Sequence, residues 1–180
     1  MRLADLIPDG LLNDENDAIG LLEAEHDKLL ELFERFDTVR RDATAAKKEV
    51  IVAEACGTLK RHMRMEEDVF YPAVRDSLHA GSNADDLMNE ALVEHDGARS
   101  LVDELENMDG EDDLFDAKFK VLAEYTRHHI REEREQMFPR VRASSLDLKT
   151  LGQKMIASEK APPIRRRLPR SDRQRPFPVS

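Results

Sequence analysis

The segments HMRMEEDVFYP (residues 62–72) and HIREEREQMFP (residues 129–139) share one arrangement of histidine, glutamate and proline. In each segment a glutamate follows the histidine by four residues, and a proline follows that glutamate by six. Residues four apart lie on the same face of an α-helix. The two segments therefore predict two helices, each of which presents a histidine and a glutamate to one side.

A Glu-His-Asp triplet precedes each of these segments, at residues 25–27 and 94–96. The upstream histidines are 69 residues apart (26 to 95), and the downstream histidines are 67 apart (62 to 129). Nearly equal offsets indicate that a unit of two helices has been duplicated. The histidines are the feature that the two copies share.

Apolar residues recur at helical spacing over residues 17–41, 45–77, 82–108 and 111–143. Residues typical of turns and helix ends separate these four stretches. Because the connections are short, consecutive helices should run antiparallel. The sequence thus predicts an all-α, up-down-up-down four-helix bundle over residues 16–145.

Pro72 and Pro139 occupy matching places near the ends of the second and fourth helices. Proline inside a helix costs about 3 kcal/mol because it removes a hydrogen bond and clashes with the preceding turn. We therefore expect each proline to kink or end its helix.

The ends of the chain differ from the bundle in composition. Residues 1–15 are expected to form an N-terminal arm, and an apolar pattern over residues 146–160 predicts a short fifth helix that closes one end of the bundle. Residues 161–180 contain five prolines and six arginines, a composition that cannot support a packed core. They are predicted to be a basic, disordered tail.

Charge and cysteine content narrow the classes of protein to which the chain can belong. The net charge is −10, and since residues 146–180 carry +6, the bundle carries −16. Such an acidic bundle argues against nucleic acid binding by the bundle, whereas the basic tail is compatible with an acidic protein partner, a lipid surface or nucleic acid. With one cysteine, no signal peptide and no apolar run long enough to span a membrane, we expect a cytoplasmic protein.

The four repeated histidines all fall within the apolar stripes of their helices, at similar distances from the turns. They should therefore lie in one buried layer of the bundle, together with the two glutamates that share their faces. Two buried carboxylates would repel each other unless cations lay between them. The predicted metal ligands are His26, His62, Glu66, His95, His129 and Glu133.

Six ligands exceed what one tetrahedral zinc uses. Two ions bridged by the glutamates, with two histidines on each, fit this set, and imidazole with carboxylate suits iron or manganese. Two non-haem iron ions are the favoured interpretation, and manganese or a single metal ion is the alternative. No separate catalytic residue and no organic cofactor site is predicted.

Several neighbouring residues have a plainer interpretation. His128 should face away from His129 and lie at the edge of the bundle, although a register that uses His128 and Glu132 is an alternative. His79 is expected to interact with a helix C-terminus, and Tyr125 to pack or to line the pocket. Cys56 should be an inert core thiol. Glu67 and Asp68 are expected on a solvated flank.

The pattern resembles the hemerythrin-like HHE cation-binding domains over roughly residues 16–145. The resemblance rests on the two Glu-His-Asp triplets, the two histidine-to-proline segments and the opening DAIGLLEAEHDKL (residues 17–29). It implies a four-helix bundle with a non-haem di-iron centre, and the six residues named above match the family's ligand pattern.

One departure distinguishes this chain from the animal oxygen carriers of that family. Those proteins have a second histidine four residues beyond the third-helix histidine and an aspartate on the last helix, whereas this chain has Arg99 and Glu133. The site therefore resembles a bacterial group with four histidine and two glutamate ligands, which is linked to nitrosative stress, iron handling and sensing. This argues against reversible oxygen transport.

Two functions follow from the resemblance. In the first, the di-iron centre reacts with or senses oxygen, peroxide or nitric oxide in a stress response, and turnover of peroxide or nitric oxide is one form that this can take. In the second, the domain handles iron or acts as a regulatory sensor through a partner, without turnover.

Overall fold

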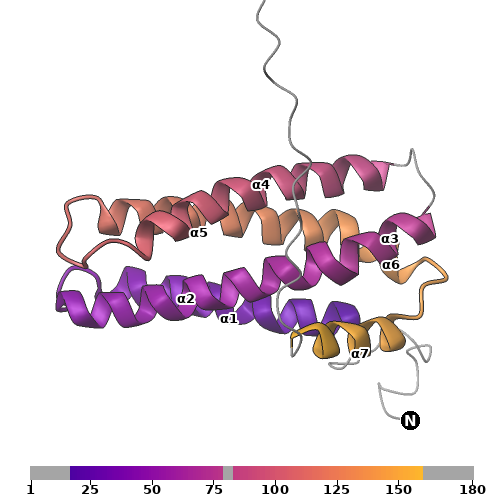
Figure 1. The fold of residues 1–180 in the computed structure, drawn as a ribbon, viewed down its shortest axis with the longest axis horizontal. Coiled ribbons are helices and arrows are strands. Elements are labelled where there is room, and N and C mark those ends of the chain that lie inside the picture. Colours follow the sequence, from indigo (N-terminus) through magenta and orange to yellow (C-terminus); the bar gives the residue numbers. More distant parts are fainter. Residues whose placement is uncertain (1–16, 79–82, 160–180) are drawn as a thin grey trace, which may run out of the picture.

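The structure is a computed structural model that describes residues 17–78 and 83–159. These residues form helices only, without a strand, and the chain order is shown in Figure 1. The α-helices are α1 (Ala18–Val39), α2 (Ala45–Met65), α3 (Tyr71–Leu78), α4 (Asn83–Leu105), α5 (Phe115–Glu132), α6 (Phe138–Arg142) and α7 (Leu148–Glu159). Two short π-helical turns, η2 (Glu66–Phe70) and η3 (Glu133–Met137), interrupt this series.

Four long helical arms lie side by side and alternate in direction (Figure 1). Helix α1 packs against α2, and α4 packs against α5, so that each half of the duplicated sequence is one helical hairpin. The hairpins meet through contacts of α1 with α5 and of α2 with α4. The predicted four-helix bundle is therefore confirmed.

The predicted fifth helix corresponds to α7, which packs against α1, α2 and η2 at one end of the bundle (Figure 1). Leu151 and Met155 are its buried residues, whereas Ile156 of the predicted apolar pattern is 38% exposed. The predicted N-terminal arm (1–15) and basic tail (161–180) lie outside the described residues.

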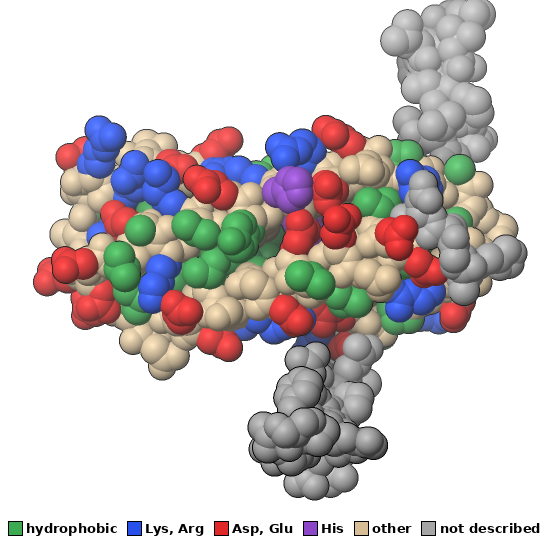
Figure 2. All heavy atoms as spheres, turned by 90° about the horizontal axis from the view of Figure 1, so that it is seen from above, with side chains coloured by type: hydrophobic (Ala, Val, Ile, Leu, Met, Phe, Trp, Pro, Cys, Tyr) green, Lys and Arg blue, Asp and Glu red, His purple; other side chains and the backbone are tan. Residues whose placement is uncertain are grey.

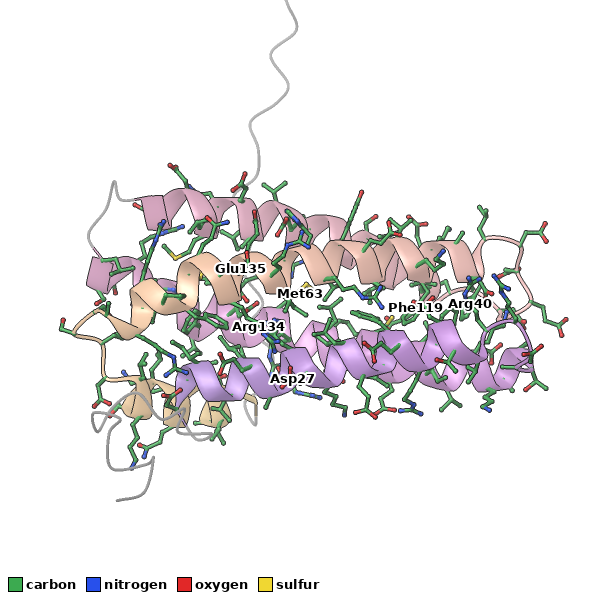
Figure 3. All side chains as sticks on the ribbon, turned by 180° about the vertical axis from the view of Figure 1, so that it is seen from behind. Asp27, Arg40, Met63, Phe119, Arg134 and Glu135 are labelled. Carbon is green, nitrogen blue, oxygen red and sulfur yellow. The ribbon has the colours of Figure 1, made fainter. Side chains whose placement is uncertain are left out.

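The apolar core consists of two clusters rather than one continuous column. Leu29, Phe33 and Phe119 belong to the cluster near the α1–α2 turn, and Leu22, Phe70 and others belong to the cluster near α7. Two of these apolar partners, Met63 and Phe119, are visible inside the bundle in Figure 3. The predicted ligand histidines lie between the clusters, because each is flanked along its helix by members of both.

Pro72 and Pro139 are predicted to kink their helices or to end them, and in the structure neither proline ends its helix. Each proline follows a π-helical turn and lies within a helix that continues beyond it, α3 for Pro72 and α6 for Pro139. In the two π turns Tyr71 N–H donates to the Glu66 carbonyl and Phe138 N–H to the Glu133 carbonyl, five residues back. The wider turn lets the chain pass a residue that cannot donate a helical hydrogen bond.

The connection between α4 and α5 also differs from expectation, because the fourth helix begins at Phe115 instead of residue 111. Gly110 is buried there against the α1–α2 turn, and its N–H donates to Glu49 Oε1 at 2.8 Å. A Cβ atom at Gly110 would lie 2.8 Å from the Ala45 carbonyl oxygen, closer than packing allows. The close approach of the two turns explains why glycine stands at this point.

Along the described chain, none of the helices is both long and apolar enough to cross a membrane.

Candidate metal centre

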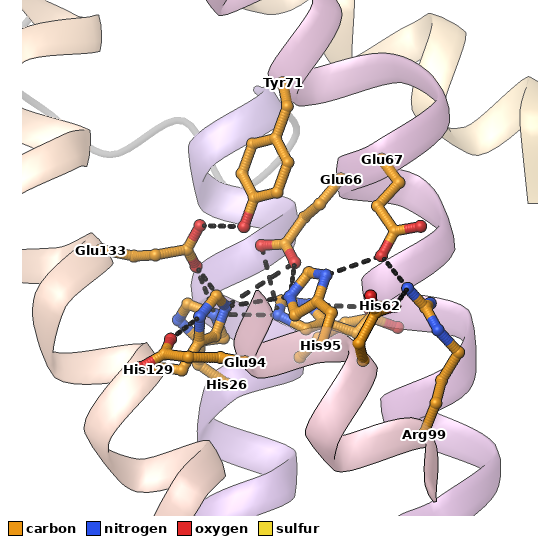
Figure 4. A network of polar contacts seen from close by, with 12 residues as sticks. His26, His62, Glu66, Glu67, Tyr71, Glu94, His95, Arg99, His129 and Glu133 are labelled. Atoms are coloured by element: carbon orange, nitrogen blue, oxygen red, sulfur yellow. Dashed lines mark hydrogen bonds and ion pairs between the residues drawn. The ribbon is translucent and has the colours of Figure 1, made fainter. Parts of the chain in front are cut away.

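The six predicted ligands come from all four arms of the bundle and meet in one buried layer (Figure 4). Their relative exposures range from 0% to 4%. Helix α1 supplies His26, the α2–η2 arm supplies His62 and Glu66, α4 supplies His95, and the α5–η3 arm supplies His129 and Glu133. Each glutamate begins a π-helical turn, a distortion that is frequent at functional sites.

The Nε2 atoms of the four histidines converge on the centre of the layer. His26 Nε2 lies 3.1 Å from His62 Nε2, and His95 Nε2 lies 3.3 Å from His129 Nε2. The two imidazoles of each pair therefore point at a common position. One pair comes from each hairpin, which reproduces the duplication seen in the sequence.

The carboxylates of Glu66 and Glu133 lie between these pairs. Glu66 Oε1 is 3.3 Å from His62 Nε2 and Glu66 Oε2 is 3.2 Å from His95 Nε2, so this carboxylate spans both pairs. Glu133 Oε2 is 3.2 Å from His26 Nε2 and 3.5 Å from His129 Nε2. Both glutamates therefore have the bridging arrangement that two neighbouring cations require.

Both oxygens of Glu66 and Oε2 of Glu133 are buried without a hydrogen-bond partner in the described structure. Burial, followed by the charge of Glu66, raises the pKa of Glu133 to about 8. Burial opposes ionisation of Glu66 as well, but the surrounding imidazoles, His62 foremost, hold its pKa well below the usual range. Unpaired buried carboxylate oxygens facing imidazole nitrogens fit metal ions, which would satisfy both kinds of group.

Among the described residues, three groups have ligand atoms that all lie within 4.8 Å of one another, and one of them, Glu94, His128 and Glu132, is partly exposed and includes none of the six ligands. The six ligands make up the other two sets: His26, His62, Glu66 and Glu133 form one, and Glu66, His95 and His129 form the other. Because Glu66 belongs to both, the geometry suits two adjacent ions that share a carboxylate. The second set offers three protein ligands where the first offers four.

Three of the histidines direct the outer nitrogen, Nδ1, toward a carboxylate. His95 Nδ1 lies 2.8 Å from Glu67 Oε1, His129 Nδ1 lies 3.1 Å from Glu94 Oε2, and His62 Nδ1 lies 3.4 Å from Glu25 Oε2. An acceptor at Nδ1 fixes the ring and makes Nε2 a better metal ligand. The expectation that Glu67 lies on a solvated flank is wrong, since its carboxylate is only 16% exposed and also accepts from Arg99.

His26 differs from the other three, because its Nδ1 has neither a hydrogen-bond partner nor a facing carboxylate among the described residues, whereas His62 Nδ1, also without a hydrogen bond, still faces Glu25. The repeat places Arg134 where the other half has Glu67. Arg134 donates to Asp27 Oδ1 at 2.7 Å and to the Glu23 carbonyl at 3.1 Å, on either side of His26 along α1 (Figure 3). Burial, with the neighbouring His62, Arg134 and His129, lowers the pKa of His26 well below its usual value.

Aromatic rings cover the layer on the side toward α7. Tyr71 stacks on His95 with ring centroids 5.9 Å apart, and Phe138, at the matching repeat position, stacks on His26 at 5.7 Å. The Tyr71 hydroxyl donates to Glu133 Oε1 at 3.0 Å (Figure 4). Burial, followed by the negative charge of Glu133, raises the pKa of Tyr71, which keeps the hydroxyl a donor.

The remaining candidates lie apart from this layer. The side chain of His128 is 49% exposed and contacts Arg131, as the chosen register of the fourth helix requires. Tyr125 is 51% exposed and is therefore not packed in the core, but it lines a small cavity beside His95 and His129, the other role expected of it. Cys56 is fully buried, and burial raises the pKa of its thiol to about 12, which agrees with an inert core thiol. His79 lies outside the described residues.

The acceptors Glu25, Glu67 and Glu94 and the donor Tyr71 were missed by sequence reasoning. A signal existed for two of them, because Glu25 and Glu94 precede the histidine in both triplets. No such repeat marks Glu67 or Tyr71, whose counterparts are Arg134 and Phe138.

The chain is similar to known proteins in sequence and in fold. The sequence model of the family described as "Hemerythrin HHE cation binding domain" matches residues 17–141. The crystal structure of a hemerythrin HHE cation binding domain-containing protein from Mycobacterium kansasii has a similar fold, with a TM-score of 0.62 and 22% sequence identity over 79% of this chain and 85% of that chain. The comparison with curated proteins gave no match.

Proposed function

Since this chain belongs to the hemerythrin HHE cation-binding domain family, we propose that it is a non-haem di-iron protein that reacts with or senses oxygen, peroxide or nitric oxide. The observation that carries the proposal is the buried layer of four histidines and two glutamates, in which three of the four carboxylate oxygens face imidazole nitrogens without a hydrogen-bond partner among the described residues. Metal binding in general is what the family and the ligand clusters imply. The number of metal ions and their identity as iron are part of the proposal.

We assign His26 and His62 to one ion and His95 and His129 to the other, with Glu66 and Glu133 between them. Two iron ions held in this way supply one-electron redox chemistry and coordination positions that a small molecule can take. The carboxylates neutralise the charge of the ions, and the imidazoles set their geometry. Manganese at both positions, or a single ion shared by the layer, is the alternative.

The surrounding residues would orient these ligands and keep bulk water out. Glu67 and Glu94 hold the rings of His95 and His129 through Nδ1, and Tyr71 holds one oxygen of Glu133. The apolar clusters on both sides of the layer lower its polarity. Such a setting limits access to small molecules and strengthens electrostatic interactions inside it.

The test is anaerobic loading with ferrous iron, followed by optical spectra after addition of oxygen, peroxide or nitric oxide. The proposal predicts new charge-transfer absorption with at least one of the three, and none in the metal-free protein. Iron that binds and is released again with no spectral response to any of them would contradict it. That outcome would favour iron handling, or a regulatory role through a protein partner of the basic tail. Cytoplasmic location stays a prediction from the sequence.

A further inference from the structure

A small cavity lies between α4 and α5 and reaches the candidate metal centre from one side. Two ligand histidines line it, and its volume is about 10 Å³. Its full lining is Leu59, Glu94, His95, Ala98, Tyr125, Thr126 and His129. A larger hollow of about 250 Å³ next to Cys56 includes none of the six ligands, so size alone does not mark the route to the centre.

The cavity meets the half of the centre that contains His95 and His129. These two histidines group with Glu66, whereas His26 and His62 group with Glu66 and Glu133. Arg99, one turn beyond His95, is bound to Glu67 and Asp96 and therefore adds no ligand there. The cavity therefore leaves space for an external molecule beside His95 and His129.

Tyr125 lies between the cavity and solvent. Its side chain is 51% exposed, and its ring lies over α4 at Gly97, where an added Cβ atom would be 3.8 Å from Tyr125 Cε2. Gly97 offers the ring no side chain to pack against, and exposed side chains change rotamer within nanoseconds. Figure 2 shows this face of the molecule, with a histidine at the surface among acidic side chains and hydrophobic side chains nearby.

The lining also restricts which molecules can enter. A volume of about 10 Å³ is close to the minimum that holds one water molecule, so with Tyr125 in place the cavity is nearly closed and only the smallest molecules can enter when its ring moves. The Thr126 hydroxyl donates to the Leu122 carbonyl and is thus occupied, while Leu59 and Ala98 are apolar. The carboxylate of Glu94 places negative charge in the wall, which disfavours anions.

We propose, building on the proposed function, that neutral molecules of two heavy atoms, such as nitric oxide and oxygen, reach the centre between α4 and α5 and are held beside His95 and His129, with Tyr125 as the movable cover. Tyr125 controls entry in this proposal and belongs to neither set of metal ligands.

The experiment measures the association rate of nitric oxide with ferrous-loaded protein by stopped-flow absorption. Tyr125→Ala removes the cover and should increase the rate several-fold, and Ala98→Leu fills the cavity and should decrease it several-fold. Val121→Ala removes an exposed side chain one turn before Tyr125, and Ala53→Leu enlarges a residue in the larger hollow, so both controls should keep the rate of the unchanged protein. Azide, an anion of three atoms, should associate more slowly than nitric oxide, and Tyr125→Ala should reduce that difference.

Iron per chain and thermal unfolding are measured on each variant before the rates. If the Ala98→Leu variant does not load iron, the association rates of Tyr125→Ala and Val121→Ala are enough to test the entry route. A rate that Tyr125→Ala leaves unchanged at equal iron content overturns the entry route while the proposed function stands. If the unchanged protein loads iron but responds to neither nitric oxide nor oxygen nor peroxide, the proposed function itself falls.

Discussion

Glu133 is the residue whose chemistry depends most on what the layer contains. In the metal-free protein, burial and the charge of Glu66 raise its pKa to about 8, well above the ordinary value of 4.5. A folded-state pKa raised in this way contributes stability that is fully present below about pH 4.5 and is lost as the pH rises through about 8. A cation reverses the situation, because it requires the ionised carboxylate.

Metal uptake should therefore release a proton from Glu133 at about pH 7, where the carboxyl is still protonated, and not at about pH 9. Proton release can be measured in weakly buffered solution during an anaerobic titration with ferrous iron. Glu133→Gln carries no ionisable group and should release fewer protons at about pH 7, in addition to binding iron more weakly. Equal release at both pH values in the unchanged protein would contradict the assignment.

Arg134 offers a second test at this scale, because it stands where the repeat has an acceptor for a ligand histidine. Arg134→Glu should supply His26 Nδ1 with the acceptor that it lacks and tighten iron binding, by a factor of the order of 10 to 100. Glu67→Gln should weaken binding on the His95 side by a similar factor. Competition with chelators of graded strength measures both changes.

Arg140→Glu is the matched control, since Arg140 is exposed and the substitution changes the charge equally on the same arm of the bundle. If Arg140→Glu tightened iron binding as much as Arg134→Glu, the effect would be general electrostatics and not the missing acceptor.

The ligand histidines could be found from the sequence because duplication and a four-residue spacing leave a periodic signal. Their acceptors could be found only in part. Glu67 and Arg134 occupy equivalent positions with opposite charge, so the repeat itself hides the role of each. In the structure, α4 lies close enough to η2 for Glu67 to contact His95, whereas η3 places Arg134 against Asp27 on α1. Glu67 therefore supports a ligand histidine and Arg134 does not.

At the scale of the elements, the helices were predictable and the π turns were not. Apolar spacing predicts the helical arms, but a proline near the end of an arm is compatible with a kink, a helix end or a wider turn. Packing decides, because Val74 and Val141, which follow the prolines, are buried in the core near α7. A helix that ended at either proline would leave those side chains without that site.

Two glycines give opposite expectations for the same substitution. Gly57 lies in α2 with nothing within 4 Å of an added Cβ, so Gly57→Ala should stabilise the protein by roughly 0.5–1 kcal/mol. Gly110→Ala should destabilise it by roughly 1–3 kcal/mol, because its Cβ would press on the Ala45 backbone. Denaturant unfolding of both variants measures the difference. Similar stabilities would show that the α4–α5 connection does not pack on the α1–α2 turn as described.

At the scale of the whole molecule, two apolar clusters hold a polar layer between them. The six candidate ligands are already buried by the residues within 17–159 that the structure describes. The tail's role and its disorder remain predictions from its composition.

Deleting residues 161–180 should leave iron content and helical content unchanged, and the free energy of unfolding within about 1 kcal/mol of the full chain. The tail's proline and arginine content gives it no place in a core. Binding to an anionic surface is what the deletion should weaken, as raised salt should also do. Loss of iron in the truncated protein would show that the tail covers the centre.

The central claim is that six side chains hold two metal ions, and the iron content of the protein tests it most directly. Metal-free protein is loaded anaerobically with excess ferrous iron, desalted, and analysed for iron and for protein. The account predicts two irons per chain, and a marked loss in Glu66→Ala, which removes the carboxylate common to both ligand sets, but not in His128→Ala. A single tightly held zinc per chain, with no uptake of iron, would contradict it.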